Sequence, residues 1–439
     1  MTLLKDIRID SLAHGGASVA RTEDGRVAFI AAGCPGDIVD AEVVADKGRF
    51  VEAEIVRIVE PSPDRRTAPC PYFGTCGGCQ WQHVSYAVQA ASKQREVVDA
   101  LTRIGRFEGI EVPATVSGPA PYGYRNRQEM RMGTGPDGRL VIGLMAARSD
   151  TIVPIDTCLL LPERARRMPK AISGALRYLA GRTPLDLERV SLRVASGTRD
   201  VEIDLWGAPG GFPRNAVSKT LSDAVRADVI TRALVKGDMR ERADAKVEVL
   251  KGKGYWREKL GDRSFRVSAP SFFQINSVLA ATMQQMVLDA LQPGSRDRVL
   301  DLYAGVGTFT LPLAEVAGEV AAIEGAGSAV RDLRANLEDA EQWADVLPGD
   351  AARALAEAGS FDLAVVDPPR SGMTPDALAA LVDTGARRIC YVSCDPATLA
   401  RDARALTEAG YRLLSAAPVD LFPQTWHVET IAVLDRVRP

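Results

Sequence analysis

From about residue 271 onward, apolar segments of strand length alternate with segments of helical periodicity, and this rhythm constrains the fold more than any other feature. Strand–helix alternation is the pattern of a parallel, doubly wound sheet. In such sheets the carboxyl ends of the strands face the crevice where ligands bind. We expect strands at residues 298–302, 320–324, 363–367, 389–393 and 428–434.

A glycine-containing loop directly follows the first of these strands. The run from Asp301 to Phe309 contains Gly305 and Gly307, which let the backbone turn tightly and approach a ligand. Glu324 ends the next strand, where a carboxylate can accept hydrogen bonds from two ribose hydroxyls. This pattern predicts an adenosyl cofactor. Nicotinamide binding is the competing interpretation, but the fuller Gly-x-Gly-x-x-Gly pattern is absent.

Polar residues also follow other strands of the predicted sheet. Asp367 begins an Asp-Pro-Pro-Arg run after one apolar strand, and the two prolines make this loop rigid. Cys394 follows the next strand, directly before a helix that we expect to begin at Pro396. Because both residues fall at strand ends, as Asp301 and Glu324 do, we expect all four to lie on one edge of the sheet.

A cysteine near such a loop indicates a particular chemistry. Carbon 5 of a pyrimidine attacks a methyl sulfonium only after a thiolate has added to carbon 6, so the reaction needs a cysteine and a base. Cys394 fits the first role because the dipole of the following helix favours a thiolate. Cys390, inside the strand, is interpreted as a buried small hydrophobe. Glu429 and His427 are rival bases, and spacing alone does not choose between them.

Three of the seven cysteines cluster in the pattern Cys70-x5-Cys76-Gly-Gly-Cys79. Disulfides are rare in a chain of cytosolic character, whereas zinc and an iron–sulfur cluster both accept four thiolates. The spacing is wider than the usual Cys-x2-Cys pairs of zinc sites, which favours an iron–sulfur cluster. Cys158 is the natural fourth ligand.

Composition and the N-terminal sequence bear on location and partners. A hydrophobic fraction of 46% is ordinary for a soluble globular protein. No apolar run is long enough to cross a bilayer, and the N-terminus lacks a secretory signal, so we expect a cytoplasmic, monomeric protein without a membrane partner. The net charge is −3, so a nucleic-acid partner would be met by local basic patches such as residues 122–131.

The chain before residue 271 shows a different organisation. Residues 1–61 alternate apolar and polar positions between glycine turns, which predicts a small OB-like β-barrel. A linker and the cysteine cluster come next, followed by an amphipathic helix from about Ser85 to Arg106. Residues 118–270 are strand-rich. The predicted fold class is multi-domain α/β, with an N-terminal barrel, a β-rich central domain and a C-terminal Rossmann-like sheet.

These residues resemble a known family, the S-adenosylmethionine-dependent RNA uridine-5-methyltransferases that carry a TRAM domain and a [4Fe-4S] cluster. The resemblance covers nearly the whole chain. Its most specific motifs are Cys70-x5-Cys76-Gly77-Gly78-Cys79-Gln80, Phe273-Gln274-Ile275-Asn276, Asp367-Pro368-Pro369-Arg370, Ser393-Cys394-Asp395-Pro396 and His427-Val428-Glu429.

The resemblance implies a role for each motif. It makes Cys394 the nucleophile and Glu429 the base. The methyl donor would be contacted by Gln274, Tyr303, Glu324 and Asp367, with Asp350 as a weaker candidate near the adenine, and the cluster would be held by Cys70, Cys76, Cys79 and Cys158. Residues 1–61 would form a TRAM-type RNA-binding barrel. Residues 62–85 and 118–270 would form the central iron–sulfur domain, and residues 86–117 and 271–439 the methyltransferase domain.

The resemblance also implies the substrate, a uridine in structured RNA that flips out of its stack. We expect 23S ribosomal RNA before transfer RNA, because the TRAM-plus-cluster form resembles the ribosomal branch. Two departures stand out: Thr308 occupies a position where the family often has asparagine, and the barrel is rich in acidic residues. The alternatives are an RNA cytosine-5-methyltransferase and a non-catalytic RNA-binding iron–sulfur protein.

Overall fold

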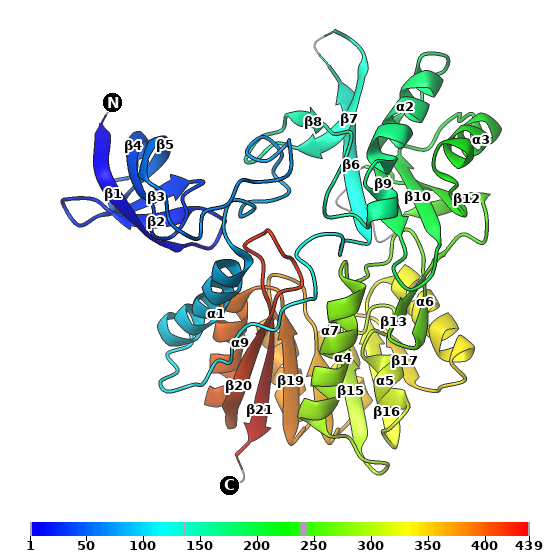
Figure 1. Ribbon diagram of the computed structural model, residues 1–439. Helices are drawn as coiled ribbons and strands as arrows, with labels where there is room; N and C mark the ends of the chain where they lie inside the picture. The colour runs from blue at the N-terminus through cyan, green and yellow to red at the C-terminus, as the bar shows by residue number, and fades with distance from the viewer. Residues whose placement is uncertain (1, 136, 238–244, 438–439) are drawn as a thin grey trace.

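The computed structural model describes residues 2–135, 137–237 and 245–437, so a few residues inside the expected domain ranges lie outside the described part. Figure 1 shows three bodies, an N-terminal barrel, a central sheet with two helices, and a C-terminal sheet flanked by helices on both faces. In the described part of the chain, no helix has both the length and the apolar character needed to cross a membrane.

The N-terminal body is a closed barrel with strand order β1-β2-β3-β5-β4. The alternating pattern of the sequence turns side chains such as Ile9, Ile30 and Val39 into its core. The predicted barrel is therefore confirmed. Its strands are β1 (Leu3–Leu12), β2 (Ser18–Arg21), β3 (Val27–Ala31), β4 (Ile38–Asp46) and β5 (Phe50–Glu60).

The central body is a seven-stranded sheet in the order β12-β11-β10-β9-β6-β7-β8. Helices α2 (Met168–Ala180) and α3 (Arg214–Val225) pack on it through Ile172, Leu176 and Leu221. A short 3-10 helix, η1 (Glu163–Ala165), precedes α2. The strands are β6 (Arg127–Thr134), β7 (Leu140–Met145), β8 (Ile152–Pro154), β9 (Leu187–Val194), β10 (Val201–Gly207), β11 (Val229–Leu234) and β12 (Lys246–Lys251).

The C-terminal body is a seven-stranded, Rossmann-like sheet in the order β17-β16-β15-β18-β19-β21-β20. β15 to β19 pair in parallel, whereas β21 runs antiparallel to both neighbours. The predicted strands all lie in this sheet. Its strands are β15 (Arg298–Leu302), β16 (Glu319–Glu324), β17 (Asp345–Pro348), β18 (Leu363–Val366), β19 (Arg388–Ser393), β20 (Tyr411–Val419) and β21 (Glu429–Arg436).

Helices cover both faces of this sheet, as strand–helix alternation requires. One face is packed around Met283, Val287 and Leu333, and the other around Leu355, Leu381 and Leu399. The helices are α4 (Ser277–Leu291), α5 (Thr310–Ala314), α6 (Gly327–Asp339), α7 (Ala351–Ala358), α8 (Pro375–Asp383) and α9 (Pro396–Glu408).

Two segments from outside residues 271–439 also pack on the C-terminal sheet. α1 (Tyr86–Arg103) lies beside α9 and β20, as Figure 1 shows. The hairpin of β13 (Trp256–Leu260) and β14 (Arg263–Val267) packs on α4 and α6, with Trp256 and Phe265 against Phe273. The sequence analysis assigned residues 256–267 to the central domain, whereas their apolar side chains lie in the core of the C-terminal body.

Candidate active site

A cavity of about 520 Å³ opens at the carboxyl edge of the C-terminal sheet. It brings together residues that follow several different strands, because the ends of neighbouring strands meet at this edge. Cys394 and Glu429 lie in its wall, and so do four of the predicted donor contacts: Gln274, Tyr303, Glu324 and Asp367.

The glycine loop after β15 forms one end of this cavity. Gly305 and Gly307 have φ angles of 58° and 97°, a backbone region that favours glycine. A side chain at Gly307 would also meet Leu311 and Leu333 at 2.7 Å. The backbone amides of Gly305 and Ala326 donate to the two carboxylate oxygens of Glu324 at 2.8 and 2.6 Å. Glu324 is therefore held in one orientation, and its oxygens keep further lone pairs for a ligand.

Two carboxyl groups near this loop have raised pKa values. Asp301 is fully buried, and its Oδ2 accepts a hydrogen bond of 2.6 Å from the Thr310 hydroxyl. Burial raises the pKa of Asp301 to about 7. Burial and the nearby Asp301 likewise raise the pKa of Asp367 to about 7. The donor end of the cavity therefore carries less negative charge near neutral pH than its residue types indicate.

Asp350 is the one predicted donor residue that does not line this cavity. It is the N-cap of α7, and its Oδ1 accepts hydrogen bonds from the backbone amides of Ala352 and Arg353 at 3.1 and 3.3 Å. Its side chain is exposed and borders a separate hollow with Arg298 and Arg353. This placement explains Asp350 by helix capping.

Cys394 stands between β19 and α9, as the sequence indicates. Asp395 caps the helix, accepting hydrogen bonds from the amides of Ala397 and Thr398 at 2.9 and 3.0 Å. Burial, together with the neighbouring Glu429 and Asp367, raises the pKa of the Cys394 thiol to about 12. The nearby guanidinium of Arg370 acts in the opposite direction, but burial outweighs it.

The two rival bases lie in different surroundings. Glu429 begins β21, is 3% exposed and lines the cavity. Burial and the nearby Asp367 raise its pKa well above the ordinary glutamate value. His427 stacks on Trp426, with ring centroids 3.8 Å apart, and is not among the residues that line the cavity. Burial and nearby cations, Arg370 first, lower the pKa of His427 to about 3.

The loop that leads to Glu429 is fixed by two residues of α1. Lys93 of α1 forms a fully buried ion pair with Asp420 and donates to the Phe422 carbonyl at 3.0 Å. Gln89, also on α1, exchanges two hydrogen bonds with Gln424 at 3.1 and 3.0 Å. Because these contacts surround residues 420–424, α1 determines the path of the chain into β21.

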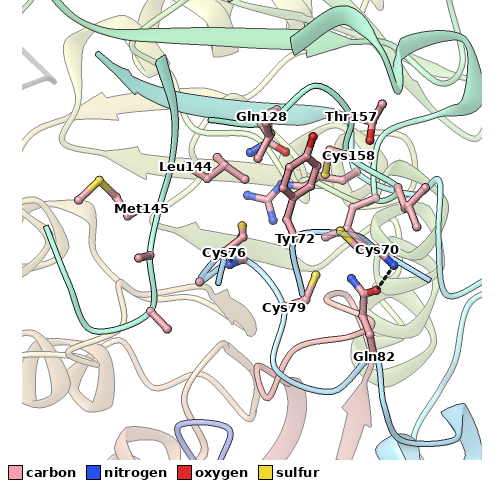
Figure 2. A pocket seen from close by; sticks show the side chains of 18 of the residues that line it. Cys70, Tyr72, Cys76, Cys79, Gln82, Gln128, Leu144, Met145, Thr157 and Cys158 are labelled. Atoms are coloured by element: carbon pink, nitrogen blue, oxygen red, sulfur yellow. Dashed lines mark hydrogen bonds between the residues drawn. The ribbon is translucent and has the colours of Figure 1, made fainter. Parts of the chain in front are cut away.

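The four predicted ligand cysteines line a second cavity of about 340 Å³. Figure 2 shows the sulfur atoms of Cys70, Cys76, Cys79 and Cys158 around this hollow, beside the ring of Tyr72. A side chain at Gly77 would come within 3.1 Å of the backbone at Met145 and Ala147. Glycine is therefore required where the cysteine segment passes the central sheet.

The grouping of these four thiols determines whether they can bind a single metal ion. A zinc ion with bonds of about 2.3 Å would draw four sulfurs to within roughly 4 Å of one another. Among the described residues, no group of three or more His, Cys, Asp or Glu side chains is arranged to hold a metal ion. The cysteines thus share one cavity without the close grouping that a single ion requires.

The sequence analysis missed three residues at the mouth of the active-site cavity. Arg370 is exposed and is the cation that acts on both Cys394 and Glu429. Phe272, with 63% of its surface exposed, and Phe422 complete the wall. Position directly after the Asp-Pro-Pro turn could have identified Arg370, but no local signal marks Phe422, which comes from a connecting loop.

Comparison with known proteins agrees with this geometry. Residues 217–346 and 355–437 match the family described as tRNA (Uracil-5-)-methyltransferase, and residues 5–56 match the TRAM domain. The chain is 33% identical to an uncharacterized RNA methyltransferase of Halalkalibacterium halodurans, over 98% of this chain and 96% of that protein.

Two further relatives have defined substrates. The chain is 33% identical to the 23S rRNA (uracil(1939)-C(5))-methyltransferase RlmD of Pseudomonas putida, over 97% of this chain and 92% of that protein. Its fold is similar to the crystal structure of Pyrococcus abyssi tRNA (uracil-54, C5)-methyltransferase in complex with S-adenosyl-L-homocysteine. That structure has a TM-score of 0.75 and 27% identity, covering 97% of this chain and 99% of that one.

Proposed function

Since the chain belongs to the family of S-adenosylmethionine-dependent RNA (uracil-5-)-methyltransferases, we propose that it methylates carbon 5 of a uridine in 23S ribosomal RNA. The observation that carries the proposal is the single cavity in which Cys394, Glu429 and the donor-loop residues meet. The similarity to a 23S rRNA enzyme over 97% of the chain supports the ribosomal substrate.

In the proposed mechanism, Cys394 is the nucleophile. Its thiolate forms a bond to carbon 6 of the flipped uracil, and the electrons of the 5,6 double bond move into the ring as an enolate. Carbon 5 thereby becomes nucleophilic. S-adenosylmethionine supplies the methyl group, which is transferred to carbon 5 as its bond to sulfur breaks. Arg370 supports the first step because its positive charge favours the thiolate form of Cys394.

Glu429 is the proposed base. After methyl transfer it removes the proton from carbon 5, and the electron pair of that bond re-forms the double bond as the carbon 6–sulfur bond breaks. Cys394 leaves as a thiolate and the enzyme is free. Burial raises the pKa of Glu429, and a carboxylate with a raised pKa is a stronger base. Its place in the cavity wall favours it over the stacked His427.

The donor would be held at the glycine-loop end of the cavity. Glu324, fixed by two backbone amides, is placed to accept the ribose hydroxyls. Tyr303 of this loop and Asp367 after β18 line the same cavity, and Gln274 enters from the segment before α4. We retain Asp350 as a candidate near the adenine only through its position after β17, since its carboxylate already caps a helix.

We also propose that Cys70, Cys76, Cys79 and Cys158 hold a [4Fe-4S] cluster. Four thiols around one cavity support this, and a cluster spreads its ligands more widely than a single ion does. Methyl transfer requires no electron transfer. A cluster there would join the cysteine segment to the central sheet, and so would position the RNA-facing parts of the molecule.

The proposed division of labour follows the expected segments. Residues 1–61 would contact RNA, residues 62–85 and 118–270 would carry the cluster, and residues 86–117 and 271–439 would catalyse the reaction, with β13 and β14 packing on the catalytic body. A transfer-RNA substrate is the second candidate, which the likeness to the Pyrococcus abyssi enzyme favours.

Nucleoside mass spectrometry tests both the reaction and the substrate. Large-subunit ribosomal RNA and transfer RNA are purified separately from cells with and without the gene. We expect 5-methyluridine to fall in the ribosomal pool alone. Loss from the transfer-RNA pool alone would replace the substrate, and unchanged 5-methyluridine in both pools would refute the proposed function.

A further inference from the structure

Four aromatic rings contact one another in series beside the active-site cavity, each tilted against the next by 37° to 62°. Phe422, in the cavity wall, contacts His427 with centroids 5.6 Å apart. His427 contacts Trp426 at 3.8 Å, and Trp426 contacts His14 at 4.1 Å. The first three rings belong to the loop before β21, whereas His14 comes from the turn between β1 and β2 of the barrel. We call these four residues the aromatic stack.

The outer end of the aromatic stack is open. The side chain of His14 is 53% exposed, and its Nδ1 lies 2.6 Å from Oε1 of Glu96 on α1. This contact fixes the ring plane. On the inner side, Trp426 packs close to Gly16, where a side chain would come within 3.3 Å of the indole. The ring of His14 is therefore held rigidly while one part of it faces solvent.

Charge near the aromatic stack has both signs. Arg370 is exposed and acts on both His14 and His427, and Arg125 also acts on His427. Glu96 and Asp395 are the carboxylates that act on His14. Aromatic rings interleaved with arginines are the surface that single-stranded nucleic acids favour, because bases stack on the rings while cations neutralise the phosphates.

We propose that the aromatic stack is the platform for the RNA bases that flank the target uridine, with His14 as the exposed terminal ring. The inference rests on the proposed function only in taking RNA as the substrate. When the target uridine enters the cavity, the nucleotides on either side of it stay at the cavity mouth. Phe422, the first residue of the aromatic stack, lies in the wall there. Part of the His14 ring faces solvent beside Trp426, so an RNA base can pack against this ring.

The aromatic stack also docks the barrel on the catalytic loop, so the test must separate binding from docking. His14→Phe keeps a ring for stacking but loses the contact with Glu96, whereas His14→Ala loses both. The probe is a short, fluorescently labelled single-stranded RNA that contains uridine, and stacking on it does not depend on sequence. Affinity for S-adenosylhomocysteine and the melting temperature are measured in parallel.

We expect His14→Ala to weaken RNA binding by about fivefold or more, the loss for one stacked base. His14→Phe should stay within about twofold of the wild type. Affinity for S-adenosylhomocysteine should be unchanged in both variants. Equal RNA affinity in His14→Ala and wild type would overturn the proposal, and so would equal weakening in the two variants, because that result would show that docking alone matters.

Tryptophan fluorescence gives a second reading. Trp81, Trp206 and Trp256 are each 1% exposed, and Trp343 is 71% exposed. Trp343→Phe therefore leaves Trp426 as the partly exposed tryptophan among the five in the chain. Adding the RNA probe to this protein should change its emission, and adding Trp426→Phe should abolish that change. Emission that does not respond to bound RNA would count against the platform.

Neither measurement depends on which RNA the enzyme modifies. If the nucleoside analysis assigns transfer RNA instead of 23S rRNA, the binding results keep their meaning. If instead the RNA probe does not bind the wild-type protein at all, the aromatic stack is not an RNA platform, whatever the nucleoside analysis shows.

Discussion

At the scale of single residues, burial raises the pKa values of two groups in the active-site cavity, and a nearby cation lowers them. Burial raises the pKa values of both Cys394 and Glu429, Asp367 raises both further, and Glu429 also raises that of Cys394. Arg370 is the cation that opposes this effect at both groups. A thiol with a pKa of about 12 is a poor nucleophile near neutral pH. Activity therefore depends on how the cavity stabilises the thiolate when RNA is bound.

Substitutions of the two candidate catalytic residues should block the reaction at different steps. Cys394→Ala should abolish methylation while leaving affinity for S-adenosylhomocysteine nearly intact, because the residue forms the bond to the base. Glu429→Gln should instead accumulate a covalent protein–RNA complex, because elimination needs the base. Denaturing gel electrophoresis with labelled RNA detects that complex. Residual turnover in Cys394→Ala, or only free protein with Glu429→Gln, would contradict the assigned roles.

Arg370 is expected to act on the nucleophile. Arg370→Gln should lower kcat at neutral pH by about tenfold for each unit by which the pKa of Cys394 rises, and should move the pH–rate profile to higher pH. Arg370→Lys should recover part of the rate. The measurement is kcat against pH at saturating RNA. Arg404→Gln on α9, which removes a partly exposed arginine paired with Glu408, is the control. An unshifted profile in Arg370→Gln would refute this role.

Asp301 predicts a pH dependence of stability. Its pKa of about 7 in the folded chain lies above the value of about 3.9 in an unfolded one. The folded state therefore binds the extra proton between these values, and stability falls as pH rises through that window, by up to about 1.4 kcal/mol per pH unit. Asp301→Asn should be stabilised relative to wild type at pH 8 but not at pH 4. Urea unfolding at the two pH values measures this, and an equal difference at both would contradict it.

At the scale of elements, α1 anchors the catalytic loop, by which we mean residues 420–428 between β20 and β21. The sequence of α1 predicts an amphipathic helix, but the functional feature is the buried Lys93, whose partner Asp420 begins the loop to β21. The pKa of Lys93 is lowered by burial and raised again by Asp420. A buried ion pair of this kind contributes specificity of placement more than stability.

Removing only one partner of this ion pair should nevertheless lower the stability of the fold, because the other charge stays buried. Lys93→Met leaves Asp420 buried without its partner, and we expect a loss of about 3 to 5 kcal/mol in the free energy of unfolding. The double variant Lys93→Met, Asp420→Leu should recover part of that loss, because no charge is then left unpaired. Urea denaturation compares the three proteins. Equal stability of the single and double variants would show that the pair does not act as a unit.

At the scale of the whole molecule, hydrogen bonds between segments far apart in the sequence connect the walls of the two cavities. Gln80 and Trp81, which follow the cysteine motif, donate backbone hydrogen bonds to the Gln424 carbonyl at 3.0 and 3.1 Å. The cysteine cavity is therefore linked directly to the loop that carries Glu429. The expected monomeric state stays a prediction.

The proposed cluster should act at this scale. Cys79→Ser should hold less iron and sulfide than the wild type purified without oxygen, and should melt at a lower temperature, because a bound group stabilises the folded state. Cys34→Ala, which alters a buried cysteine of the barrel outside the cavity, is the control for iron content. If the wild type contains stoichiometric zinc and no iron, the site binds a zinc ion and the proposed cluster is wrong.

The strand-end residues of the cavity were predictable because their position follows from local periodicity. An apolar run of strand length ends at Asp301, Glu324, Asp367 or Cys394, and parallel strands bring such ends to one edge. The barrel was predictable for the same reason, since alternation along a strand assigns each side chain to a face. The sequence could not show that Asp350 is used as a helix cap, because the motif alone does not reveal where its carboxylate points.

The sequence by itself thus determined the order of the elements, the carboxyl edge of the sheet and the residues placed along it. Only the tertiary structure decided that β13 and β14 join the C-terminal core, that Lys93 holds the catalytic loop, and that His14 of the barrel extends the stack from Phe422. The physical reason is the range of the interactions. Periodicity is set by neighbours along the chain, whereas these contacts depend on how distant segments pack.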